Sequence, residues 1–324
     1  MSNPETNTAF TVAPEEIGRR LDQFVAARTG LSRHVAHRLI EEGGVRVDGR
    51  TLRKGGTILS PSQRISLAAP AQDPRSTPPV AQPELPLEVL YEDADLVVVS
   101  KPAGAPSHPL RPGERGSLAS ALVARYPECV AANPDAREGG LCQRLDLHTS
   151  GAIVAARSAA AWASLREHFR LGHVKKEYLA LVVGVPAQDT LEVALPVLPA
   201  PGPDRHRRLI TAATPEQIYD SEALDALTRF FVVRRGAHHT LLRAETATGR
   251  RHQVRAHLSY LGLPLLGDML YGAPPPEEGE EGAGYFLHAS RICFPQPMGR
   301  GNIDVTAPLP EERARLLARL LPPK

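Results

Sequence analysis

The sequence predicts an α+β protein with a small N-terminal domain and a large C-terminal domain. The chain has 324 residues, 42% of them hydrophobic and 23% charged, which suffices for both domains. Apolar runs of strand length, such as Leu96–Val99, alternate with apolar residues at helical spacing. Residues 70–86 contain six prolines and almost no large apolar residue, so they cannot pack a core. The expected organisation is a flexible tail over 1–15, domains over 16–70 and 87–324, and a proline-rich linker over 71–86.

The composition excludes several classes of protein. No apolar run reaches the roughly 18 residues of a membrane span, and the first ten residues resemble neither a signal nor a transit peptide. The three cysteines form no CxxC pair, which indicates a reducing compartment, so we expect a cytoplasmic protein without membrane contact. The sequence has no phosphate-binding loop, dinucleotide fingerprint, serine-hydrolase elbow or cluster of metal ligands, so we expect no cofactor and no metal.

Two helices and a hairpin are expected in the small domain. Helical spacing predicts one helix that Gly30 ends, and a second from the N-cap Ser32 to Gly43. The apolar residues assigned to their buried faces are Ile17, Leu21, Phe24, Val25, Val35, Leu39 and Ile40. Val45 and Val47 alternate before Asp48-Gly49, a pair typical of hairpin turns. The residues expected to complete a small sheet are Ile58, Leu59, Ile65 and Leu67.

Positive charge is concentrated in this same segment. Residues 19–64 contain ten lysines and arginines against four acids, a local net charge of +6 in a chain whose total is only +2. On the second helix, Arg33 and His37 are spaced i,i+4, as are His34 and Arg38. Such a surface suits a polyanion, although a solvated basic face without a partner explains the charge equally well.

Residues 19–56 resemble the alpha-L RNA-binding domain, first described in a small-subunit ribosomal protein. The resemblance rests on Arg20-Leu21-Asp22, Leu31-Ser32-Arg33, Leu39-Ile40 and the segment from Gly44 to Gly49. It implies a small α/β domain that contacts RNA phosphates through a rigid basic surface. The candidate RNA-binding residues are Arg20, Arg33, His37, Arg38 and Arg46.

Four segments of the large domain carry polar residues next to predicted strands and helices. The first is a strand and turn at 87–109, and the second is a polar loop before a strand at 141–158. The third is a strand at 173–184, which follows a helix with Trp162, Leu165 and Phe169, and the fourth is a helix within 245–272. A further strand is expected at 286–295. Asp146 in the second segment could simply cap its own turn, and Tyr178 in the third could be a core residue. Arg255 borders the apolar stripe Val254, Leu258 and Leu261, so it needs an anionic partner, for which Asp146 is a candidate. Proline- and glycine-rich loops are expected over 196–208 and 273–284, the second of them mobile.

Together these segments resemble the RluA-type family of RNA pseudouridine synthases. The matching motifs, in the family's order, are Lys101–Gly104, Arg144–Gly151, Lys176–Ala180, Thr248–Leu258, Gly262–Asp268, Tyr271-Gly272 and Leu287–Ala289. The resemblance covers 87–305 and implies a catalytic domain on a mixed, mainly antiparallel sheet flanked by helices and loops. Departures from the family's pattern at Gln143, Leu147-His148 and Arg251 lie beside the catalytic positions and affect the expected substrate details.

The resemblance assigns roles to individual residues. Asp146 matches the catalytic aspartate, Tyr178 the tyrosine that packs on the target base, and Arg255 the arginine that pairs with the aspartate. Arg144 matches the arginine that fills the space of the flipped nucleotide. The further RNA-binding candidates in this domain are Lys101, Arg250 and His252.

The implied activity is the isomerisation of specific uridines in structured RNA to pseudouridine, without a cofactor. Ribosomal RNA is the favoured substrate and transfer RNA remains open, as does whether the aspartate attacks the base, attacks the sugar or assists a glycal route. We expect a monomer. The alternative function is an RNA chaperone or ribosome assembly factor on the same fold, whereas a metal-dependent nuclease lacks a ligand cluster.

Overall fold

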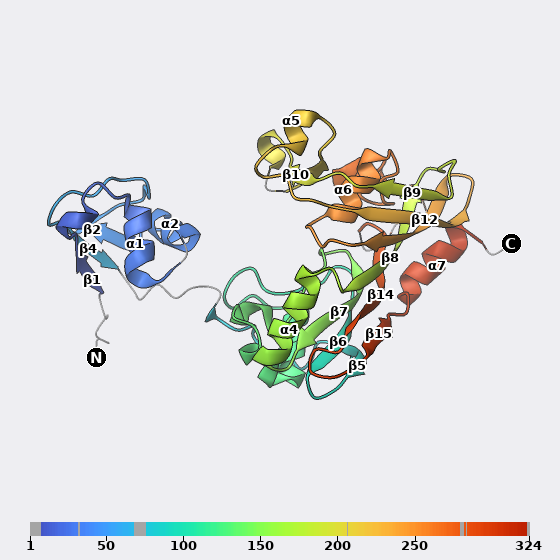
Figure 1. Ribbon diagram of the computed structural model, residues 1–324, viewed down its shortest axis with the longest axis horizontal. Coiled ribbons are helices and arrows are strands. Elements are labelled where there is room, and N and C mark those ends of the chain that lie inside the picture. Colours follow the sequence, from blue (N-terminus) through green and yellow to red (C-terminus); the bar gives the residue numbers. More distant parts are fainter. Residues whose placement is uncertain are drawn as a thin grey trace. The chain divides into compact units, whose positions relative to one another are not determined.

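The computed structural model describes residues 8–31, 33–67, 76–205, 207–278, 282 and 284–322. The chain divides into a small unit, Met1–Thr77, and a large unit, Pro78–Lys324. Figure 1 shows the small unit in blue and the large unit in colours from cyan to red. Among the described helices, none is long and apolar enough to cross a membrane.

The small unit packs two helices on a four-stranded antiparallel sheet with the strand order β1-β4-β2-β3. Its elements are α1 (Leu21–Thr29), α2 (Arg33–Glu41), β1 (Ala9–Thr11), β2 (Val45–Val47), β3 (Arg50–Thr51), β4 (Arg64–Leu67) and the 3-10 turn η1 (Pro14–Glu16). Phe24 and Ile40 from the helices meet Val45, Val47 and Ile65 from the sheet in one core. The predicted helices and hairpin are therefore present, because local spacing and turn residues determine both.

Some details of the small unit differ from the prediction. Residues 9–11 form a strand on the free edge of β4, so the predicted tail is wrong there, while residues 1–7 lie outside the described part. Ile17 precedes α1 and is exposed, and Ile58 is exposed as well, so neither belongs to the core. Ala36 takes a buried place on α2 instead, and Ser32, the predicted N-cap, is not among the described residues.

The predicted linker is partly built into the large unit. The Gln82 backbone N–H donates to the Ser120 carbonyl at 3.0 Å, and the Gln82 side chain accepts from the Gly116 N–H at 2.6 Å. Pro79 and Gln82 are buried, so the sequence from Pro78 onwards packs on the unit despite its prolines. Residues 68–75, which include the start of the expected linker, lie outside the described ranges.

A nine-stranded mixed sheet forms the centre of the large unit (Figure 1). In spatial order its strands are β5 (Glu88–Glu92), β6 (Leu96–Lys101), β7 (Ser150–Ala156), β14 (Leu287–Pro295), β8 (Lys175–Val183), β13 (His239–Thr246), β12 (Thr228–Arg235) and β9 (Thr190–Val193), and β15 (Asn302–Thr306) also pairs with β14. The pairs are antiparallel except for β7 with β14, which is parallel. The α+β class and the mainly antiparallel sheet are thereby confirmed.

Helices cover both faces of the sheet. These are α3 (Leu118–Arg125), α4 (Ala159–Arg170), α6 (Gln253–Tyr260) and α7 (Glu311–Leu320), with 3-10 turns η3 (Pro127–Ala131), η4 (Ala136–Glu138) and η6 (Met269–Tyr271). Along β6, Leu96 and Val98 share a core with α4, whereas Val97 and Val99 share one with α3. Side chains alternate along a strand, so a continuous apolar run is what a strand covered on both faces requires.

The segment predicted as a proline-rich loop at 196–208 contains regular structure. Val197–Pro199 (β10) pairs antiparallel with Leu209–Thr211 (β11), followed by the short helix α5 (Pro215–Ile218), and η5 (Gly202–Asp204) lies in the connection. The loop prediction is wrong for β10 because pairing with a strand ten residues later overrides its proline content. Residues 273–278, 282 and 284 of the second predicted loop are described and contain neither helix nor strand, and its mobility stays a prediction.

Candidate active site

Asp146 lies on a loop whose neighbouring residues, Leu145 and Leu147, are hydrogen-bonded to the connection between β6 and α3. The Ser107 hydroxyl donates to the Leu145 carbonyl at 2.8 Å and accepts from the Leu145 N–H at 3.1 Å. The Gly104 N–H donates to the Leu147 carbonyl at 2.9 Å. These bonds fix the residues on either side of Asp146, whose side chain remains 23% exposed. The loop therefore presents a carboxylate that is oriented and still accessible to a substrate.

Gly151 brings this loop close to the neighbouring strand. It has φ +112°, and a Cβ at this position would lie 2.2 Å from the Ala289 carbonyl oxygen of β14. Beside it, the Ser150 hydroxyl bonds to Nδ1 of His288 at 2.8 Å. A glycine is needed here because only a residue without a side chain allows β7 and β14 to approach.

Lys101, predicted to contact RNA, is instead fully buried at 0% exposure. Its ammonium donates to the carbonyls of Pro102 at 2.9 Å, Ala105 at 2.7 Å and Leu147 at 3.0 Å. The RNA contact is therefore wrong, and Lys101 ties the turn after β6 to the Asp146 loop. Burial, together with the positive charge of Arg313, lowers the pKa of Lys101 to about 7.

This shifted pKa predicts a pH-dependent stability. Between about pH 7 and 10.5, lysine keeps its proton in the unfolded chain but not in the folded one. The unfolded state then binds more protons, so the free energy of unfolding rises with pH, by up to about 1.4 kcal/mol per unit. Replacing Lys101 by methionine is expected to remove this rise. Urea titrations followed by fluorescence of Trp162, the single tryptophan of the chain, measure the large unit.

The exposed Lys175 provides the control, because Lys175→Met removes a lysine without removing a buried charge. Its free energy of unfolding should rise with pH as steeply as that of the wild type. An equal slope in wild type and Lys101→Met would contradict the prediction.

Arg255 is buried on α6, and its main partner is Asp268 rather than the expected Asp146. Its Nε and Nη2 donate to the two Asp268 oxygens at 2.7 and 2.9 Å, whereas its Nη1 lies 3.5 Å from Asp146 Oδ2. The guanidinium lies between the rings of Tyr271 and Tyr285, 4.5 and 4.2 Å from their centroids. Although burial disfavours its charge, the bonds to Asp268 hold the pKa of Arg255 above its ordinary value. Arg255 is thus a permanently charged, rigidly held partner of Asp146.

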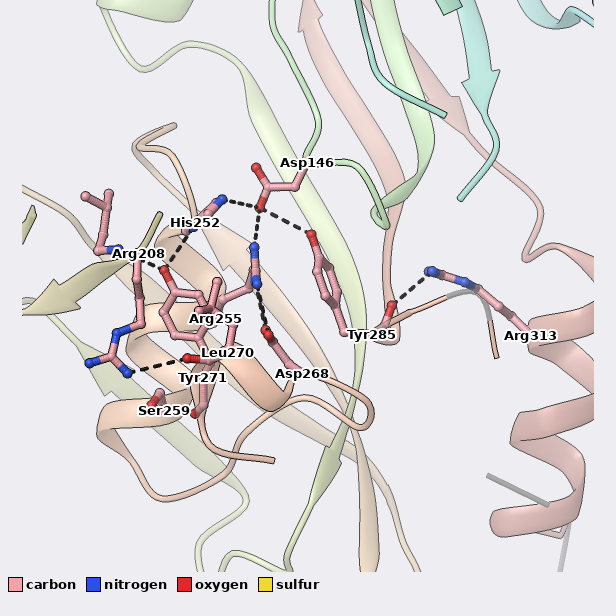
Figure 2. Close-up of polar contacts among 11 residues, drawn as sticks. Asp146, Arg208, His252, Arg255, Ser259, Asp268, Leu270, Tyr271, Tyr285 and Arg313 are labelled. Carbon is pink, nitrogen blue, oxygen red and sulfur yellow. Dashed lines mark hydrogen bonds and ion pairs between the residues drawn. The ribbon is translucent and has the colours of Figure 1, made fainter. Parts of the chain in front are cut away.

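Two further side chains approach Asp146, as Figure 2 shows. Nε2 of His252 lies 3.8 Å and Oη of Tyr285 lies 3.5 Å from Asp146 Oδ2. The half-buried ring of His252 lies within the site, and its expected contact with RNA stays a prediction. Asp268 and Tyr271 stand in the motifs described above and could have been suspected from them, whereas no sequence signal marks Tyr285.

Tyr178 lies at the middle of β8, opposite Ala244 of β13 and Ala289 of β14. Burial raises its pKa to about 12, and the negative charge of Asp146 contributes to the same shift. The hydroxyl therefore stays protonated at neutral pH, and it lies within electrostatic range of Asp146, the predicted catalytic aspartate.

The other candidate RNA contacts lie in both units. Arg144 is exposed, with Nη1 3.5 Å from Nε2 of His108, and the exposed Arg250 donates to the Asp225 carbonyl at 3.0 Å. In the small unit, Arg20 and Arg33 pair with Asp22 at 2.8 and 3.7 Å. His37 lies 3.6 Å from Glu41, and Arg38 lies 3.9 Å from Glu42. Arg46 is exposed on β2. The acids of the small unit therefore offset part of the expected positive surface. Within the described ranges, no group of three histidines, cysteines or acids is placed to hold a metal ion.

This fold and this constellation define an enzyme that acts on RNA, and comparison with known proteins agrees. The family model described as RNA pseudouridylate synthase matches residues 95–260, and the S4 domain model matches residues 19–65. The chain belongs to the RluA-type family of RNA pseudouridine synthases and carries an N-terminal S4, or alpha-L, RNA-binding domain.

Several curated relatives match nearly the whole chain. The ribosomal large subunit pseudouridine synthase D of Xanthomonas campestris is 34% identical, over 94% of this chain and 89% of its own length. The uncharacterized RNA pseudouridine synthase YlyB of Bacillus subtilis is 30% identical over 96% and 97%. Among solved structures, human RNA pseudouridylate synthase domain containing 4 has a TM-score of 0.56 and 24% identity over 72% of this chain and 92% of its own, which supports the fold.

Proposed function

We propose that this enzyme isomerises uridine in ribosomal RNA to pseudouridine and that Asp146 is its essential carboxylate. The observation that carries the proposal is the position of Asp146, on a clamped loop, accessible, and facing the charged Arg255 at 3.5 Å. The choice of ribosomal RNA rests on relatives named ribosomal large subunit pseudouridine synthase D.

The reaction breaks the bond between C1′ and N1, rotates the uracil and joins C1′ to C5, so one proton leaves C5 and one reaches N1. It needs an ionised carboxylate near the reacting atoms, and Arg255 faces Asp146 with a positive charge at 3.5 Å. The target base must leave its stack, which costs a few kcal/mol, and stacking on Tyr178 together with insertion of Arg144 can offset this cost. Attack on the base, attack on the sugar and a glycal route all use the same carboxylate.

Release of tritium from RNA transcribed with 5-tritiated uridine tests the proposal, because the new bond at C5 displaces that hydrogen. We expect release from ribosomal RNA and little from a transfer RNA pool. Release from transfer RNA alone would contradict the proposed substrate. Tight binding without release from either pool would favour the RNA chaperone or assembly-factor alternative.

The small unit is proposed to supply salt-dependent affinity for RNA. A variant with Arg33, Arg38 and Arg46 changed to glutamine should weaken binding and reduce the slope of log Kd against log salt by about 2–3. Filter binding across a salt series measures both. A variant with three exposed arginines of the large unit changed to glutamine, Arg125, Arg170 and Arg315, provides a charge-matched control. An unchanged slope in the small-unit variant would place the RNA contacts outside the small unit, and an equal slope change in the control would mean that they are not confined to it. A cytoplasmic location and a monomeric state stay predictions.

A further inference from the structure

The two carboxylate oxygens of Asp146 have different surroundings. The three donor groups that approach the carboxylate, Arg255 Nη1, Tyr285 Oη and His252 Nε2, all point to Oδ2, at 3.5, 3.5 and 3.8 Å. Among the described residues, none makes a hydrogen bond or ion pair with Oδ1. Contacts of this length are usual in a free enzyme, where catalytic hydrogen bonds tighten only when substrate binds. One oxygen is therefore surrounded by protein and the other is left for a ligand.

His252 is oriented by a hydrogen bond on its far side. The Leu209 backbone N–H donates to the Tyr271 hydroxyl at 3.0 Å, and that hydroxyl lies 3.0 Å from His252 Nδ1 (Figure 2). Because the Tyr271 hydroxyl oxygen accepts from Leu209, its proton is free to be donated to Nδ1 of His252. A neutral imidazole that accepts at Nδ1 carries its own proton on Nε2. Nε2–H then points to Asp146. Burial lowers the pKa of His252, which favours this neutral form.

Tyr285 is held by its neighbours so that its hydroxyl meets the same oxygen. The buried ring contacts the Arg255 guanidinium on its face and the His148 ring at an edge-to-face angle of 84°. Its backbone carbonyl accepts from Arg313 of α7 at 3.0 Å, which fixes the chain just before β14. Burial raises the pKa of Tyr285, with a further contribution from the charge of Asp146, so the hydroxyl remains a proton donor.

We propose that His252 and Tyr285 are positioning residues that hold Asp146 Oδ2 together with Arg255, so that Asp146 meets the target nucleotide through Oδ1. Two neutral donors orient the carboxylate without adding a second positive charge. Two nitrogens of Arg255 are bonded to Asp268, so Arg255 makes only one long bond to Asp146. Without His252 and Tyr285, that single bond would define the direction of the carboxylate only loosely. This inference rests on the proposed role of Asp146.

The test compares kcat and KM of Tyr285→Phe, His252→Ala and His252→Gln with those of the wild type. Losing a donor that orients the carboxylate should lower kcat by about 5–30-fold, with KM for RNA changed less than about twofold. The amide of His252→Gln can replace the donor and should restore part of the loss.

Tyr91→Phe is the matched control, because it also removes a tyrosine–aspartate hydrogen bond, to Asp93 at 2.9 Å on the edge strand β5. It should leave kcat and KM unchanged. Nitrogen-15 NMR of the histidines, with the His252 signals identified by their loss in His252→Gln, gives an independent readout and should find the proton on Nε2. This measurement stands even where a tyrosine variant fails to fold.

The outcomes separate this inference from the role of Asp146. An unchanged kcat in Tyr285→Phe and His252→Ala, while Asp146→Asn is inactive, would overturn the inference alone. A proton found on Nδ1 of neutral His252 would overturn the part assigned to histidine. Full activity of Asp146→Asn would overturn the role of Asp146 and the inference with it.

Discussion

Replacing Asp146 by asparagine is expected to lower the rate of pseudouridine formation by at least about 10³-fold. The amide is nearly the same size as the carboxylate, so the loop held by Ser107 and Gly104 should keep its shape. What the variant lacks is the negative charge facing Arg255. RNA affinity should stay within about twofold, since phosphate contacts dominate binding. Single-turnover tritium release and filter binding measure the two quantities.

Asp189→Asn is the matched control for this substitution. Asp189 is exposed and pairs with Arg235 at 2.6 Å, so its change removes a carboxylate and an ion pair from the surface. It should react at the rate of the wild type. A rate for Asp146→Asn within tenfold of the wild type would contradict the proposed role.

Replacing Arg255 by methionine is expected to affect both stability and activity. The unbranched side chain fits between Tyr271 and Tyr285, but buried Asp268 loses its partner. Breaking one side of a buried ion pair costs about 3–5 kcal/mol. Trp162 fluorescence during urea unfolding should report this loss for the large unit. Activity should fall as well, because Asp146 loses its only cationic contact at 3.5 Å within the described ranges.

The double variant Arg255→Met/Asp268→Leu separates the two effects. Removing both charges leaves no unpaired group, so most of the stability should return. The rate of isomerisation should not return, since the charge facing Asp146 is still missing. Recovery of activity together with stability would mean that Arg255 serves the fold only, and would contradict a direct effect on Asp146.

Features set by neighbouring residues could be predicted from the sequence. The uninterrupted run Leu96–Val99 defines a strand buried on both faces, and Asp48-Gly49 defines a hairpin, because backbone geometry alternates side chains and limits turns locally. The order of the motifs was sufficient to indicate the family. It also singled out Asp146 and Arg255, which the fold brings within 3.5 Å across 109 residues of sequence.

Features that depend on distant partners were decided only by the tertiary structure. The sequence predicts Lys101 to be a surface cation. It is buried instead, because the carbonyls of Pro102, Ala105 and Leu147 accept hydrogen bonds from its ammonium. Residues 9–11 read as a tail, yet the open edge of β4 makes them a strand. Asp268, rather than Asp146, is the main partner of Arg255, and Tyr285 reaches Asp146 from 139 residues away. Sequence spacing determines which residues share a face of one element, whereas the partner of a buried charge depends on which elements the packed sheet brings together.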